Sequence, residues 1–148
     1  MMHYEDICKG QWFEDDGDYY CKMECPKGWG RVYYFSMRFR EGKVVSFQGH
    51  QDIVPVDLFI VKKQTGQPTE KVAFASLKPG QWFEDESGFI YRKLEIPNDF
   101  GYDLDFAMHQ SGTVESFEEG QEVGLIEIDS YLNREKVILK NPIHFEEI

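Results

Sequence analysis

The residues of this chain that could support acid–base or metal chemistry are its histidines and its paired carboxylates. The carboxylate pairs Asp15/Asp16 and Asp85/Glu86 fall in turn-like segments, where such side chains usually cap backbone groups. No glycine-rich phosphate loop, His-Glu-x-x-His or Gly-x-Ser-x-Gly motif occurs. The sequence therefore predicts no catalytic site, no metal site and no cofactor, and a protein that is not an enzyme. The four histidines are scattered: His3, His50, His109 and His144.

The three cysteines could in principle form a disulfide or hold zinc, but their spacing favours neither. Cys8, Cys21 and Cys25 are odd in number and contain no Cys-x-x-Cys pair. We expect incidental thiols in a reducing, cytoplasmic compartment. The first residues lack the basic and apolar regions of a secretory signal, and no apolar run of about 18 residues predicts a membrane-spanning helix.

A tandem duplication is the element that must position any site. The hexapeptide Gly-Gln-Trp-Phe-Glu-Asp occurs at residues 10–15 and again at residues 80–85. Further identities follow after a length difference of one residue, including Tyr20/Tyr91 and Lys22/Lys93. The copies differ in length at turn-like sites only, which is typical of a repeated folding unit. We predict four segments: a first repeat over 1–63, a linker over 64–70, a second repeat over 71–128, and a C-terminal extension over 129–148 that packs on the repeats.

The apolar pattern predicts short strands throughout. In 32–39, the alternate residues Tyr33, Phe35, Met37 and Phe39 are apolar, while Ser36 and Arg38 would face the other way. Hairpin turns are expected at 41–43 and 111–113. A fifth strand is expected at 52–61, with Pro55 at an edge or bulge, and one helical turn at 129–136. The repeated aromatic pairs should form the core of each repeat: Trp12/Trp82, Phe13/Phe83, Tyr20/Tyr91, Phe35/Phe106 and Phe47/Phe117.

These features predict an all-β chain of two tandem, five-stranded, SH3-like β-barrels, with a two-sheet sandwich as the alternative. Gly-x-x-Phe, a turn, Tyr-x-Lys, a Gly…Phe segment and a closing Val/Ile strand recur in both copies. This pattern resembles small β-barrel domains found among uncharacterised phage proteins. The resemblance implies a phage or other mobile element as the source, and hence a host cytoplasm as the location. It implies no particular chemistry.

Charge is divided unequally between the halves. Residues 1–69 carry 10 acidic and 9 basic residues, whereas residues 70–148 carry 17 acidic and 7 basic residues, so almost all of the net charge of −11 lies in the second half. The first copy has Lys27, Arg31, Arg38, Arg40 and Lys43 where the second has neutral residues or histidine. Neutral sequence drift at solvent-exposed positions is one explanation of this difference. Specialisation of two binding faces is the other.

Two aromatics in glycine-containing stretches, Trp29 and Phe100, are suited to anchor an interface, although either could instead fold over the end of its repeat. We predict two partner-binding surfaces, formed by Trp29, Arg31, Arg38 and Arg40, and by Phe100, Asp103 and Asp105.

The function that these residues favour is non-enzymatic binding of a host or phage protein, with inhibition of that protein as one outcome. An acidic mimic of nucleic acid, acting on a DNA-binding protein, is the second hypothesis. A virion structural or decoration protein is the third, and a homodimer is compatible with it. Direct nucleic-acid binding is disfavoured, because a chain of net charge −11 repels phosphate at long range.

Overall fold

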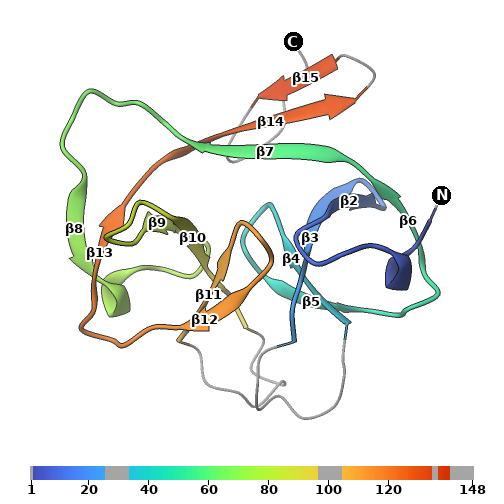
Figure 1. Ribbon diagram of the computed structural model, residues 1–148, viewed down its shortest axis with the longest axis horizontal. Coiled ribbons are helices and arrows are strands. Elements are labelled where there is room, and N and C mark those ends of the chain that lie inside the picture. Colours follow the sequence, from blue (N-terminus) through green and yellow to red (C-terminus); the bar gives the residue numbers. More distant parts are fainter. Residues whose placement is uncertain (1, 26–33, 97–104, 135–136, 141–148) are drawn as a thin grey trace.

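The computed structural model describes residues 2–25, 34–96, 105–134 and 137–140. Within them the chain is all-β, as predicted, with strands and two short 3-10 helices (Figure 1). The elements of the first copy are β1 (Met2–His3), η1 (Tyr4–Asp6), β2 (Trp12–Asp15), β3 (Asp18–Met23), β4 (Tyr34–Arg38), β5 (Val44–Phe47), β6 (Asp52–Pro55) and β7 (Asp57–Lys62). Those of the second are β8 (Glu70–Ala73), η2 (Phe74–Ser76), β9 (Trp82–Glu84), β10 (Ile90–Lys93), β11 (Phe106–His109), β12 (Val114–Ser116), β13 (Glu122–Leu125) and β14 (Ile128–Arg134), followed by β15 (Val137–Lys140).

Each copy folds into an open antiparallel sheet of six strands rather than a five-stranded barrel. The order is β1-β6-β2-β3-β4-β5 in the first sheet, and the equivalent strands take the same places in the second. The prediction of closed SH3-like barrels is therefore wrong. The chain turns into η1 directly after β1. There, the backbone N–H groups of Tyr4 and Glu5 donate to the carbonyls of Gln51 and Gly49, both at 2.8 Å.

Each sheet buries an aromatic cluster of its own on one face. In the first copy, Tyr4 stacks on Phe47 with ring centroids 4.9 Å apart, and Phe13 stacks on Tyr20 at 5.5 Å. The second copy repeats both stacked pairs, at 5.0 and 5.5 Å. Such pairs contribute both buried area and defined ring geometry. The equivalent aromatics of the second copy are Phe74, Phe117, Phe83 and Tyr91.

The opposite face of the same strands forms a core that the two copies share. Trp12 and Trp82 both enter it, and the ring of Phe39 lies 5.8 and 6.4 Å from theirs. Phe35 and Met37 lie in this shared core, so their predicted inward phase is confirmed. Ser36 lies on the other side of β4, as predicted, and is fully buried there beside Tyr4.

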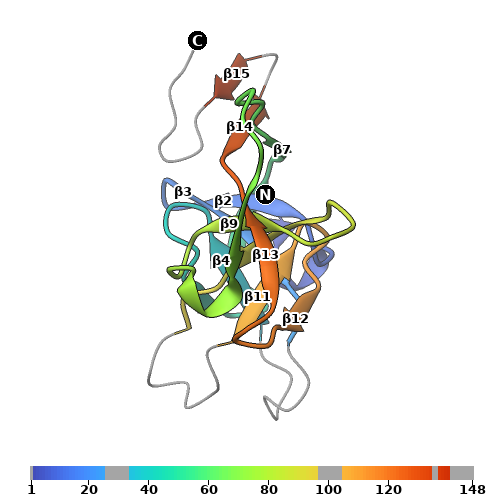
Figure 2. The same cartoon turned by 90° about the vertical axis from the view of Figure 1, so that its left-hand side faces the viewer.

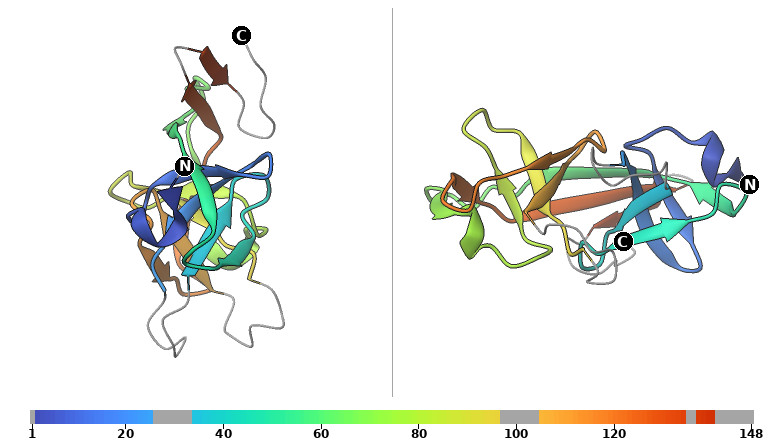
Figure 3. Two further views of the ribbon diagram at one scale, coloured as in Figure 1. Left: turned by 90° about the vertical axis from the view of Figure 1, so that its right-hand side faces the viewer. Right: turned by 90° about the horizontal axis from the view of Figure 1, so that it is seen from below.

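A ribbon of two long strands joins the copies across their junction. β7 pairs antiparallel with β14 (Figure 3, right). Ile60 lies opposite Ser130 at the centre of the pairing. These residues are equivalent in the two copies, so the ribbon is centred on a pseudo-twofold axis, as in an isologous dimer interface. The predicted strand over 52–61 is divided into β6 and β7, and the predicted helical turn over 129–136 is wrong, since residues 128–134 form β14. β15 adds the third strand of this sheet, which stands above the two repeats in Figure 2.

The hairpin turns add two reciprocal contacts about this axis. The Gly112 carbonyl accepts the N–H of Glu24 at 2.9 Å, and the Gly42 carbonyl accepts the N–H of Glu95 at 3.0 Å. Gly10 makes the close approach possible: its φ is +87°, and a Cβ there would lie 2.6 Å from the Ser111 carbonyl oxygen. The repeated hexapeptide thus begins with glycine because the other copy's turn rests on it.

Candidate functional site

Four of the predicted site residues, Trp29, Arg31, Phe100 and Asp103, lie outside the described residues. The other three, Arg38, Arg40 and Asp105, lie in the described part of the chain.

Arg38 and Arg40 lie at the end of β4 and in the turn that follows. Arg38 is ion-paired with Glu41 in this turn and lies 3.8 Å from Asp18, and its hydrogen bond to Glu41 is the main cause of its raised pKa. Arg40 pairs with Asp18 at 3.0 Å, but 70 % of its side chain is exposed. Arg38 therefore holds its own hairpin in place, and Arg40 is the more accessible of the two cations.

Asp105 is half-buried just before β11. Its carbonyl accepts the N–H of Phe117 at 2.9 Å, and the charge of its carboxylate favours the protonated form of Lys93. Within the described segments, Asp105 forms no ion pair with either arginine.

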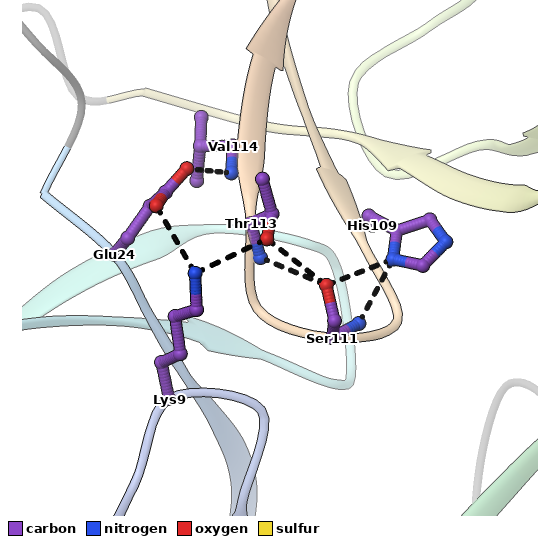
Figure 4. Close-up of polar contacts among 6 residues, drawn as sticks. All are labelled: Lys9, Glu24, His109, Ser111, Thr113 and Val114. Carbon is purple, nitrogen blue, oxygen red and sulfur yellow. Dashed lines mark hydrogen bonds and ion pairs between the residues drawn. The ribbon is translucent and has the colours of Figure 1, made fainter.

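The β11–β12 turn has a polar junction with the first copy (Figure 4). The Lys9 Nζ donates to Glu24 Oε2 and to Thr113 Oγ1, both at 3.3 Å. His109 Nδ1 lies 2.9 Å from Ser111 Oγ and accepts the Ser111 N–H at 3.1 Å. A histidine beside a serine hydroxyl also occurs where a nucleophile is activated. Here the two residues are two positions apart, and their contacts close the turn on which the copies meet.

The repeated lysines are also structural. The Nζ of Lys22 donates to the carbonyls of Tyr4 and Ile7, at 3.2 and 2.8 Å, and lies 4.7 Å from the centre of the Tyr4 ring. Lys93 makes the equivalent contacts with η2 of the second copy. Burial lowers the pKa of both lysines. Each lysine therefore satisfies the backbone at the end of its 3-10 helix.

The outer face of the β7–β14 ribbon is the feature that best fits a binding role. Along β7, Leu58 and Ile60 point to the shared core, while Phe59 and Val61 point outward and are 51 % and 43 % exposed. Tyr131, which is half-buried, lies directly opposite Phe59. We define the outer face as Asp57, Phe59, Val61, Asp129 and Tyr131. It is an apolar centre with carboxylates beside it.

Sequence reasoning missed this face, although the repeat held a signal. A core position should be apolar in both copies, as with Leu58 and Ile128. Phe59 corresponds instead to Asp129, and such a change of polarity between copies is typical of a solvent-facing position. The alternation along the strand then places Val61 on the same side.

Over the ranges that the structure describes, no group of three or more His, Cys, Asp or Glu side chains is placed to hold a metal ion. Those same ranges contain no helix long and apolar enough to cross a membrane. Comparisons of the chain with protein-family models, curated proteins and solved structures gave no match. The function must therefore be inferred from these residues themselves.

Proposed function

We propose that this chain is a non-enzymatic protein-binding protein that docks its partner on the outer face. The observation that carries the proposal is the exposure of Phe59 and Val61 on the same side of β7, with Tyr131 of β14 opposite Phe59. Aromatic side chains at the centre of an otherwise polar surface are typical anchors of protein interfaces.

The ribbon is suited to this role because its inner face is fixed. Leu58, Ile128 and Leu132 are each less than 10 % exposed and belong to the core that both copies build. Binding at a preorganised surface costs less conformational entropy than binding at a mobile loop. The duplication thus provides a rigid platform at the junction of the two copies.

The charge of the chain supports one kind of partner in this proposal. Asp57 and Asp129 flank the apolar centre, and the net charge of the whole chain is −11. Opposite charges steer association and suppress wrong pairings, so we infer a partner with a basic rim around an apolar pocket. A DNA-binding protein has a basic surface, and with such a partner the acidic second half would mimic nucleic acid.

A pull-down from lysate of the natural host, with and without nuclease, tests the proposal. The variant Phe59→Ser/Val61→Thr should lose a partner that the wild type retains after nuclease treatment. Phe89→Ser is the matched control, because Phe89 is 56 % exposed but lies in the second copy, away from the ribbon. If the partner is lost at raised salt and is also displaced by DNA, nucleic-acid mimicry would be favoured. Equal recovery by the wild type and the ribbon variant would refute the proposal, and self-assembly alone would favour a virion structural role.

A further inference from the structure

An open cleft of about 600 Å³ lies at the junction of the copies, separate from the outer face. It is bounded by the β4–β5 turn of the first copy, by residues 78–82 and 125–128 of the second, and by Lys63. Its volume is that of pockets that bind small molecules or the ends of peptides.

Arg92, on β10, lines this cleft and is 4 % exposed. Its Nε donates to the Gly80 carbonyl at 2.8 Å, and its Nη1 donates to the carbonyls of Arg38 and Phe39. Its guanidinium carbon lies 4.8 Å from the centre of the Trp82 ring. In the described part of the chain Nη2 has no hydrogen-bond acceptor, and no carboxylate pairs with the guanidinium. One donor group of a buried cation is therefore without a partner.

The missing counter-ion is unusual for a buried charge. Buried arginines are normally paired with carboxylates, because carbonyls and rings offset desolvation only in part. Burial lowers the pKa of Arg92 to about 9, and the charge of Glu41 opposes that shift only in part. An anion entering the cleft would supply both the absent charge and an acceptor for Nη2.

The fold does not need an arginine at this position. The first copy has Cys21 there, fully buried and packed in the shared core. Lys78, on the rim of the cleft, likewise corresponds to Cys8. Two of the cations around the cleft, Arg92 and Lys78, thus stand where the first copy has cysteines. Arg40, Lys63, Glu41 and Glu127 also line the cleft, so its cations outnumber its carboxylates.

The backbone favours a carboxylate over a phosphate. Phosphate sites usually offer several free N–H groups at a glycine turn. Here the N–H groups of Gly80, Gln81 and Lys78 donate to Lys93, to Lys78 and to the side chain of Gln81, and Pro79 has none. A carboxylate needs fewer donors, and the Nη2 of Arg92 can give it a charge-assisted hydrogen bond. Trp82, Ile126 and Ile128 give the cleft apolar walls for the rest of the ligand.

We propose that this cleft binds a carboxylate carried on an apolar or aromatic body, with the carboxylate on Arg92 and the body against Trp82. The carboxylate belongs either to a free organic acid or to the C-terminal residue of a peptide. This proposal does not depend on the outer face, whose residues lie elsewhere on the molecule.

Titration of the full chain with 3-phenylpropionate tests the proposal, followed by the indole ¹H–¹⁵N signal of Trp82. The variant Trp82→Phe assigns that signal. We expect a saturable shift at millimolar acid and none with 3-phenylpropionamide, which has the same body without the charge. Inorganic phosphate should leave the signal unchanged. A dipeptide ending in phenylalanine, with a free or an amidated C-terminus, distinguishes the two sources: tighter binding of the free dipeptide than of the small acid assigns a peptide end.

Arg92→Met should weaken binding about tenfold or more, since it removes a charge-assisted hydrogen bond. Arg92 also donates to three backbone carbonyls, so replacing it changes the fold as well as the cleft. Lys78→Glu therefore provides a second variant at an exposed position. Lys71→Glu is its control, with the same change of charge at an exposed residue of β8 outside the cleft. Lys78→Glu should weaken binding and Lys71→Glu should not. The proposal is overturned if the amide binds as well as the acid, if phosphate binds better, if no probe shifts Trp82, or if both lysine variants behave alike.

Discussion

The buried hydroxyl pair of Tyr4 and Ser36 allows a quantitative test of how the two copies diverged. Tyr4 Oη donates to the Phe35 carbonyl at 2.9 Å and lies 2.7 Å from Ser36 Oγ, and neither side chain is exposed. The second copy has Phe74 and Ala107 at these positions, also fully buried. Both hydroxyls are thus absent together in one copy and present together in the other.

Removing the two hydroxyls one at a time should lower the free energy of unfolding by more in total than removing both together. Tyr4→Phe leaves the Ser36 hydroxyl buried without its described partner, which costs about 1–3 kcal/mol. Ser36→Ala costs about 1 kcal/mol, because the Tyr4 hydroxyl keeps the Phe35 carbonyl. The double variant reproduces the chemistry of the second copy. Its cost should fall below the sum of the single costs by about 1 kcal/mol.

Urea unfolding of the wild type, both single variants and the double variant measures this coupling. The reverse cycle in the second copy is the matched control. Phe74→Tyr alone should destabilise, and adding Ala107→Ser should restore part of the loss. Strictly additive free energies of unfolding in the first cycle would refute the reasoning that the hydroxyls satisfy each other.

Three further predictions concern the junction, the 3-10 helix and alkaline stability. Gly10→Ala should destabilise by about 1–3 kcal/mol more than Gly17→Ala in urea unfolding, because both have positive φ but only Gly10 meets backbone of the other copy; equal costs would contradict the contact. Lys22→Met should cost about 1–3 kcal/mol and speed amide exchange around η1, because two carbonyls lose their donor; unchanged exchange would contradict this role. Burial raises the pKa of the Cys21 thiol above its ordinary 9.0, so its contribution to stability is complete below pH 9 and is lost as the pH rises further. Between pH 8 and 10, Cys21→Val should therefore lose about 1 kcal/mol less stability than the wild type, and parallel losses would argue against it.

The duplication and much of the strand pattern could be predicted because they depend on local signals. The glycine turns and the alternation through Phe35 and Met37 are visible in short windows and agree between copies. Burial on both faces of β4 could not be predicted, because Ser36 is polar and its partner Tyr4 comes from a distant element.

The pairing of β7 with β14 was missed for a related reason. The predicted boundary of the second repeat fell directly after Ile128 and separated this residue from Ser130 and Leu132. The three alternate residues in fact belong to one strand, β14. Partner choice between strands 70 residues apart has no local signature. The cleft depends on the same long-range arrangement, since only the folded chain places the β4–β5 turn beside Arg92.

The most direct test of the proposed function is site-specific photo-crosslinking in the natural host. A photoreactive phenylalanine analogue replaces Val61 on the outer face in one protein, and Phe89 in a second, matched protein. The proposed function predicts one discrete, nuclease-resistant crosslinked protein from position 61 and none from position 89. Crosslinks from position 89 but not from position 61, or none from either, would contradict docking on the ribbon.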